Sequence, residues 1–175
     1  DAFYYCDALT DVECDKLEII GKYAFCGCES LRIMNLPSAR IVKGGAFSNC
    51  EALTEAIFGN KLERFERRAF CNCTSLERIT IPLKNGLITA DNPFAVCENL
   101  KRVDLVEGEL HEIVAALQLD DWRNDMNEAI DSINQTLLTA NAGHYDAEVE
   151  EDGRGKAQAI RAWIRSVLGK IIDYK

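Results

Sequence analysis

An alternation of apolar and polar positions recurs along the first hundred residues and marks five short segments. Each segment has two apolar residues at alternate positions, and the positions beside them are mostly polar. Successive side chains of a β-strand point to opposite faces, so each pair predicts a strand with one buried face. The pairs are Val12 and Cys14, Met34 and Leu36, Ala56 and Phe58, Ile79 and Ile81, and Val103 and Leu105.

A string of the form Ala-Phe-x-x-Cys-x-x-Leu precedes these segments, with Pro-Phe in place of Ala-Phe before the last. Its cysteines are 22, 22, 23 and 24 residues apart. A unit this short cannot bury its own apolar face, so neighbouring units must stack with their strands in parallel. Residues 1–106 are therefore predicted to form a solenoid of about five repeats of 22–24 residues. The expected core columns are Cys6, Cys28, Cys50, Cys73 and Cys97, and Leu9, Leu31, Leu53, Leu76 and Leu100.

Residues 20–31 read Ile-Gly-Lys-Tyr-Ala-Phe-Cys-Gly-Cys-Glu-Ser-Leu. This segment resembles the unit of the BspA-like leucine-rich repeats (leucine-rich repeat type 5), and the resemblance covers about residues 1–106. It implies a right-handed solenoid with parallel strands and short helical turns, and a binding role rather than an enzymatic one. The family includes surface adhesins and many proteins of unassigned function, so the resemblance names no ligand. The chain begins within a repeat and without methionine, which predicts further sequence upstream.

The apolar spacing changes after Gly108 to the three- and four-residue steps of helices. Residues 107–175 are therefore predicted to form a helical cap followed by a helical hairpin. The first helix carries the stripe Leu110, Ile113, Val114 and Leu117, and it is expected to cover the last repeat. A second helix is expected to start at Asp120 and Asp121, and a third to run from Ala157 to Tyr174.

The last helix has two interpretations. It can pack against its acidic neighbour within the chain, as amphipathic helices do in bundles. Alternatively, it can dock into a groove of a partner. The residues that would carry the second interpretation are Trp163, Arg161, Arg165 and Lys170.

The net charge and the motifs of the sequence limit the classes of function that we expect. The formal net charge of −9 disfavours nucleic acid and anionic membranes as partners. The sequence contains no run of about 18 apolar residues, the length that would predict a membrane span. The chain has only two histidines, His111 and His144, and it lacks a phosphate loop, a metalloprotease motif and a readable catalytic triad. We therefore expect no enzyme activity and no cofactor.

The eight cysteines raise the question of disulfides or a metal. Five belong to the repeat column, and neighbouring side chains in a parallel stack point the same way, which opposes a disulfide. Cys26 and Cys71 precede column cysteines and are expected to face outward. Their two turns lie two repeats apart, too far to share one zinc ion. Free thiols, no metal and a reducing intracellular compartment rather than secretion are the resulting expectations.

A binding role needs a surface, and the outward strand positions supply one. Two isoleucines with charged neighbours fit the pattern of a hot spot with a polar rim, although scattered apolar residues are also common on surfaces. We therefore expect a protein-interaction or scaffold module, a subunit or recruiter of a larger complex; the alternative is a BspA-type cell-surface adhesion module. The candidate contact residues are Asp11, Glu13, Ile33, Asn35, Glu55, Ile57, Arg78, Thr80, Arg102 and Asp104.

Overall fold

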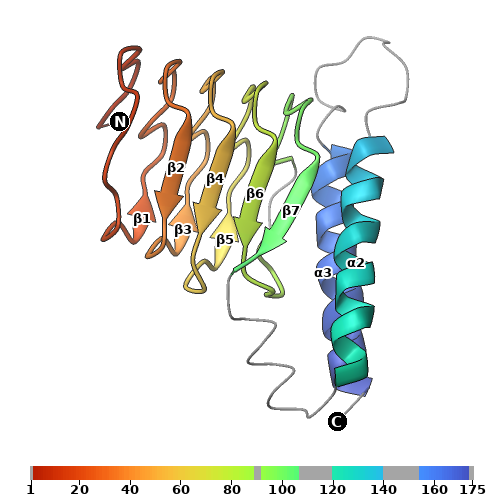
Figure 1. Cartoon of the computed structure of the whole chain (residues 1–175). Coiled ribbons are helices and arrows are strands. Elements are labelled where there is room, and N and C mark those ends of the chain that lie inside the picture. The colour runs from red at the N-terminus through yellow and green to blue at the C-terminus, as the bar shows by residue number, and fades with distance from the viewer. Residues whose placement is uncertain (1, 89–91, 107–119, 140–153, 174–175) are drawn as a thin grey trace.

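The computed structural model describes residues 2–88, 92–106, 120–139 and 154–173. Within them, stacked coils carry two parallel sheets, and two helices follow (Figure 1). The larger sheet has the order β2 (Ile33–Leu36), β4 (Glu55–Phe58), β6 (Arg78–Ile81) and β7 (Arg102–Leu105). The smaller sheet has the order β1 (Ile19–Ile20), β3 (Ile41–Val42) and β5 (Arg64–Phe65). The predicted parallel-strand solenoid is confirmed.

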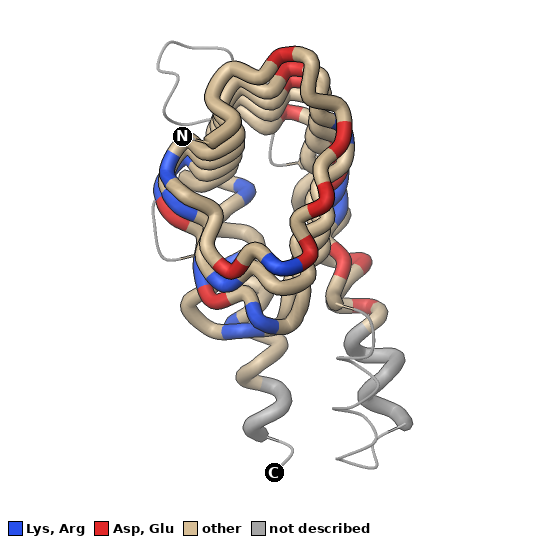
Figure 2. Tube along the Cα trace, turned by 90° about the vertical axis from the view of Figure 1, so that its left-hand side faces the viewer, with Lys and Arg blue, Asp and Glu red and all other residues tan. Residues whose placement is uncertain are grey.

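Equivalent residues of successive repeats lie side by side. Ile33 pairs with Glu55, Glu55 with Arg78, and Arg78 with Arg102. Figure 2 looks along the stack, and the coils superimpose there as one closed outline. The repeat period therefore fixes the register of the sheet, because each turn of the solenoid uses one repeat.

Three columns of side chains fill the interior. The leucines of the column from Leu31 to Leu100 are fully buried, and so are the cysteines from Cys28 to Cys97, within 1%. The phenylalanine rings stack along the axis, with centroids 5.1 Å (Phe3–Phe25), 5.3 Å (Phe25–Phe47), 5.0 Å (Phe47–Phe70) and 5.7 Å (Phe70–Phe94) apart. Cys6 and Leu9 are only partly buried, since the first coil of the structure has a neighbour on one side.

The expected strand around Val12 and Cys14 is not formed. In the later coils, backbone bonds such as Thr54 N–H to Arg32 O (2.8 Å) and Glu77 N–H to Thr54 O (2.9 Å) start each strand pairing. No equivalent bond joins Arg32 to Thr10 among the described residues. Cys14 is buried as predicted, at 4% exposure. Without a ladder there is no strand, and β2 is therefore the edge of the larger sheet.

Each coil turns its corners with residues in the left-handed region. One such position precedes the column cysteine, as at Tyr5, Asn49 and Asn72, and another precedes the Ala-Phe pair, as at Tyr23 and Arg68. Between them, a single hydrogen-bonded turn such as Cys50 N–H to Phe47 O (3.3 Å) closes the corner. Only glycine, and less readily asparagine, adopts this conformation without strain.

Two helices of 20 residues each, α2 (Asp120–Thr139) and α3 (Arg154–Asp173), lie beside the last coil (Figure 1). They pack on each other, and α2 also contacts β7. Their apolar residues join the solenoid core, and the buried ones include Ile133, Leu137, Ile160, Ile164 and Val167. The two helices are thus confirmed. The short helix expected after Gly108 lies outside the described residues, and the domain boundary at residue 106 stays a prediction.

Two polar side chains on these helices bond the last coil. Asn134 Oδ1 accepts a hydrogen bond from the Val103 backbone N–H (2.9 Å), on the outer side of β7. Lys156 Nζ donates to the carbonyls of Cys97 (2.6 Å) and Glu98 (2.9 Å). One repeat earlier, the carbonyl equivalent to that of Glu98 accepts from Asn99 of the following coil (2.7 Å). The helices therefore supply hydrogen bonds that a further coil would otherwise make, and so protect an edge strand.

Replacing Lys156 with methionine should weaken this cap. The side chain is 2% exposed, so methionine keeps most of the packing while the two carbonyls lose their donor. We expect the free energy of unfolding to fall by about 1–3 kcal/mol, the usual cost of unsatisfied buried polar groups. Urea unfolding followed by circular dichroism measures this change. An unchanged midpoint would show that Lys156 does not contribute to capping.

Candidate binding surface

The outward strand residues form two rows across the larger sheet, which we call the sheet face. The first row is Ile33, Glu55, Arg78 and Arg102, and the second is Asn35, Ile57, Thr80 and Asp104. The rows follow from the parallel register, because every second residue of each strand points away from the core. Asp11 and Glu13, the other two candidates, are exposed but precede the sheet and belong to no strand.

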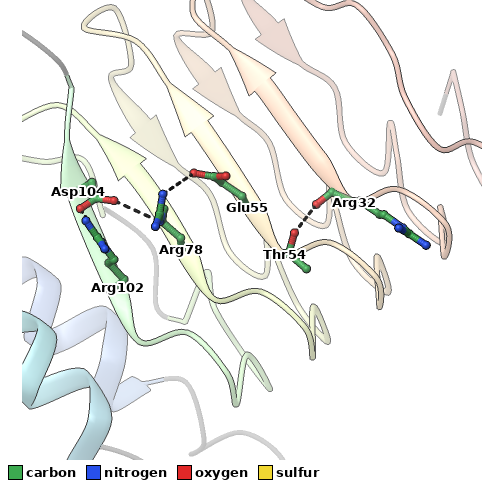
Figure 3. Close-up of polar contacts among 6 residues, drawn as sticks. All are labelled: Arg32, Thr54, Glu55, Arg78, Arg102 and Asp104. Carbon is green, nitrogen blue, oxygen red and sulfur yellow. Dashed lines mark hydrogen bonds and ion pairs between the residues drawn. The ribbon is translucent and has the colours of Figure 1, made fainter.

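The charged residues in the later coils pair with one another (Figure 3). Arg78 Nη1 lies 3.4 Å from Glu55 Oε1, and Arg78 Nε lies 3.4 Å from Asp104 Oδ2. Arg102 Nε is 2.9 Å from the other oxygen of Asp104. Such exposed pairs add little stability. Their effect is to balance two acids with two bases, so this half of the sheet face carries no excess charge.

The apolar part of the sheet face centres on β2. Ile33 is 51% exposed, whereas Ile57 is half-buried, so the expectation of two exposed isoleucines is wrong for Ile57. The difference arises because β4 has a neighbouring strand on each side while β2 is an edge. Arg32 is exposed next to Ile33, and its side chain points away from the ion pairs in Figure 3.

A shallow depression borders Arg32, the residue before Ile33. It is lined by Thr10, Glu29, Ser30, Arg32 and Ala52. Arg32 contributes its backbone carbonyl to the Thr54 hydroxyl at 3.0 Å, and its guanidinium has no ion pair among the described residues. An exposed apolar side chain beside an unpaired cation and a hollow can bind a protein surface, whereas nothing in this arrangement activates a nucleophile.

The second set of candidates, on α3, lies mostly inside the fold. Trp163 is 8% exposed, and Ile164 beside it is also buried. Arg161 and Arg165 border a cavity facing residues 84–88 of the solenoid. The side chain of Lys170 lies outside the described residues. This placement favours the intramolecular packing of α3 over docking of Trp163 on a partner.

The cysteine column forms a ladder of thiol hydrogen bonds. Each thiol donates to the phenylalanine carbonyl of the preceding coil: Cys28 to Phe3 (3.1 Å), Cys50 to Phe25 (3.1 Å), Cys73 to Phe47 (3.0 Å) and Cys97 to Phe70 (2.9 Å). All eight cysteines lie in the described residues, and none forms a disulfide. The ladder gives the repeated cysteine a structural role, as a small core residue whose weak donor is satisfied.

Cys26 is buried at 6% exposure, so the prediction that it faces outward is wrong. It stacks in one column between Tyr4 and Ser48, as the backbone bonds Tyr5 N–H to Cys26 O (2.7 Å) and Gly27 N–H to Ser48 O (2.8 Å) indicate. Cys71, expected to face outward as well, is half-buried. Among the described residues, no three His, Cys, Asp or Glu side chains are grouped to hold a metal ion.

The buried thiols predict a loss of stability at alkaline pH. Burial raises the pKa of Cys50 to about 12 from its ordinary 9.0. Above pH 9 the unfolded chain releases this proton, whereas the folded chain keeps it. The contribution of the protonated thiol to the free energy of unfolding is therefore complete below pH 9 and disappears as the pH approaches 12. We expect the free energy of unfolding to fall by about 1 kcal/mol between pH 8 and pH 10 for this group. Urea titrations at both pH values test this, and Cys50→Ala should reduce the fall.

Residues 1–115 match the family model described as a BspA type leucine-rich repeat region, in six copies. A solved leucine-rich repeat protein from T. pallidum is 30% identical, with a TM-score of 0.54 over 58% of this chain and 48% of that protein. A leucine-rich repeat protein from Bacteroides ovatus ATCC 8483 is 34% identical, with a TM-score of 0.53 over 59% of this chain and 27% of that protein. No curated protein matches the chain.

The chain thus spans about half or less of the length of these two proteins. The family model covers the coils that carry the sheet face. Leucine-rich repeat proteins generally bind other proteins or serve as scaffolds, and they are typically not catalytic. Because the matched residues make up well over half of the sequence and coincide with the observed coils, the chain belongs to the BspA-type leucine-rich repeat family.

Proposed function

We propose that this chain is a non-catalytic scaffold module, a subunit or recruiter of a larger assembly, which binds another protein through the N-terminal half of the sheet face. The observation that carries the proposal is the 51% exposure of Ile33 on an otherwise regular sheet. An apolar side chain with polar neighbours becomes a hot spot when a partner buries it and the polar residues exclude water around the contact.

The charges around Ile33 suggest the chemistry of the partner. The ion pairs among Glu55, Arg78, Arg102 and Asp104 leave that side of the face balanced. On the other side Asp11 and Glu13 are exposed and form no ion pair among the described residues. A partner with an apolar side chain for Ile33, basic groups for these two acids and an acidic group for Arg32 would be complementary. Its association rate should fall as salt is raised.

The compartment is part of the same proposal. Eight unpaired thiols, most of them buried, fit a reducing intracellular environment. Neither described helix has the length and apolarity to cross a bilayer. Thiol titration of the native and denatured protein tests the assignment: we expect eight free thiols, mostly hidden before unfolding. Paired cysteines would instead favour the cell-surface adhesion module.

The matched pair Ile33→Glu and Leu138→Glu tests the surface. The two side chains have nearly equal exposure, 51% and 49%, but Leu138 lies on α2. Affinity capture with quantitative mass spectrometry should identify a partner with the wild-type chain and with Leu138→Glu, at similar amounts. Ile33→Glu should reduce its capture by about 30-fold or more, the loss that corresponds to removing a hot spot.

Circular dichroism must show the same unfolding midpoint for both variants, since neither replaces a buried residue. If the wild-type chain and both variants capture the partner equally, the sheet face does not bind it and the proposal is wrong. Loss of capture by Leu138→Glu alone would transfer the binding surface to the helices.

A further inference from the structure

The loop after β6 contains the only Asn-Gly pair in the sequence, Asn85-Gly86. Both residues are exposed in a turn, and Gly86 adopts a left-handed conformation (φ 78°). A Cβ atom built at Gly86 would have no heavy atom within 4 Å apart from those of its chain neighbours, so water can approach this residue. Among the described residues, neither the backbone N–H of Gly86 nor the side-chain amide of Asn85 has a hydrogen-bond partner.

A turn of this kind favours an intramolecular reaction of the asparagine, because it holds the reacting atoms close together. The main-chain nitrogen of Gly86 loses its proton to hydroxide and attacks Cγ of Asn85. The new N–Cγ bond closes a five-membered succinimide, and the side-chain nitrogen takes a proton from water and leaves as ammonia. Water then opens the ring. Cleavage of the N–Cγ bond gives aspartate, whereas cleavage of the original peptide bond gives isoaspartate, in which the main chain runs through Cγ.

The glycine distinguishes this pair from the asparagines at the corners of the coils. Glycine has no side chain to shield its nitrogen, and its backbone rotates readily into the geometry of attack. Asn49 and Asn72, in contrast, have side chains that are hydrogen-bonded to each other (3.0 Å). The next N–H in each case, that of Cys50 or Cys73, donates within its corner turn. The fold therefore protects these two asparagines and leaves Asn85 open to reaction.

We propose that Asn85-Gly86 is a site of spontaneous deamidation in the folded chain, and that its isoaspartyl product loosens the attachment of this loop to β5. Phe65 N–H donates to Leu87 O (2.8 Å), and Ile88 forms a parallel bridge with Phe65. The side chains of Leu87 and Ile88 are buried in the close-packed core, which leaves them little room to shift. Isoaspartate adds one carbon atom to the main chain between β6 and these anchors, and the changed length weakens the pairing with Phe65.

The first test follows deamidation of the whole chain, native and denatured in urea, at mildly alkaline pH, where hydroxide promotes the attack. Peptide mapping by mass spectrometry detects and locates the exchange of the side-chain NH2 for OH. We expect Asn85 to react in the native chain within about tenfold of its rate in urea, a difference of about 1.4 kcal/mol in activation free energy. An intact Asn85 in the native chain, while the denatured chain reacts, would show that the fold protects the turn and would overturn the site.

Asn60 is an internal control, because it is also exposed in a turn but is followed by Lys61. In the native chain it should react more slowly than Asn85 by about tenfold or more, since the lysine side chain raises the barrier by at least about 1.4 kcal/mol. Equal rates at the two asparagines would contradict the role given to glycine. Asp152-Gly153, outside the described residues, can form the same intermediate without a change in mass, so it does not enter this comparison.

The variant Asn85→Asp separates the effect of charge from that of main-chain length. It carries the carboxylate of the deamidated chain on an unaltered main chain, and its Tm should stay within about two degrees of the wild-type value, as for most surface substitutions. The isoaspartyl form, purified from the aged chain, should melt several degrees below Asn85→Asp in differential scanning calorimetry. Equal Tm values for these two forms would show that the loop keeps its attachment to β5.

Discussion

Replacing Phe47 with alanine is expected to lower the free energy of unfolding by about 3–5 kcal/mol, the usual cost of removing a buried phenylalanine. The ring is fully buried and stacks between Phe25, at 5.3 Å, and Phe70, at 5.0 Å. Its loss leaves a cavity and interrupts contacts between three successive coils. Solenoid stability is approximately a sum over neighbouring repeats, so an interior break is costly. Urea unfolding monitored by circular dichroism gives the value.

Phe3→Ala is the matched control. Phe3 occupies the same column but is only partly buried, and among the rings of that column it stacks on Phe25 alone. Its replacement should cost less than half as much as that of Phe47. Equal losses for the two variants would contradict the stacked-column description of the core.

A methyl group added at Gly59 is expected to destabilise the chain by about 3 kcal/mol, at the upper end of overpacking effects. A Cβ atom built there would lie 2.1 Å from the carbonyl oxygen of Pro37 in the preceding coil. Because that obstacle is backbone, neighbouring coils would have to separate locally and weaken the pairing of β2 with β4. The Tm of Gly59→Ala, measured by differential scanning calorimetry, should therefore fall by several degrees.

Gly21→Ala separates steric overlap from the general effect of replacing glycine. No heavy atom lies within 4 Å of a Cβ built at Gly21, and its φ is not in the left-handed region. Its Tm should change little or rise slightly, since alanine restricts the unfolded chain. A large fall for Gly21→Ala, or none for Gly59→Ala, would show that coil separation is not set by this contact.

The core was predictable from the sequence because one period governs it. Leu31, Leu53 and Leu76 recur at the spacing of the coils, and all three are fully buried. The alternation that predicts Met34 and Leu36 as inward residues also predicts that Ile33 and Asn35 face outward. Val42 and Phe65, which also lie at equivalent positions of successive repeats, pair in the second parallel sheet. Each of these apolar positions recurs in several repeats, so several parts of the sequence support the same prediction.

Features that occur only once were not predictable. Lys156 shows nothing in its sequence context that marks it as a buried donor to the last coil, because its partners are backbone carbonyls 58 and 59 positions away. The segment around Val12 has the strand pattern but lacks the hydrogen-bond ladder, which depends on the neighbouring coil. Cys26 is buried by the column in which it stacks, and its immediate sequence does not show that.

The sequence predicted where the candidate surface lies, but it did not predict how exposed its residues are or which ion pairs they form. Strand alternation places Ile33, Ile57 and Arg78 on the outer face. Sequence does not show that Ile57 is half-buried by strands on both sides, or that Arg78 bridges Glu55 and Asp104. These differences move the centre of the surface to β2. They follow from the side chains of neighbouring coils. The repeat period determines which positions become neighbours, but it does not determine which residue types occupy them.

Site-specific photo-crosslinking tests the proposed binding surface most directly. A photoreactive amino acid with an aliphatic side chain, which keeps the position apolar, is placed at Ile33 and separately at Leu138, and compares the sheet face with the helical cap at nearly equal exposure. The proposal predicts one defined protein adduct from position 33, lost when Asp11 and Glu13 are replaced by lysine, and none from position 138. Adducts from position 138 alone, or the same adducts at equal yield from both positions, would contradict it.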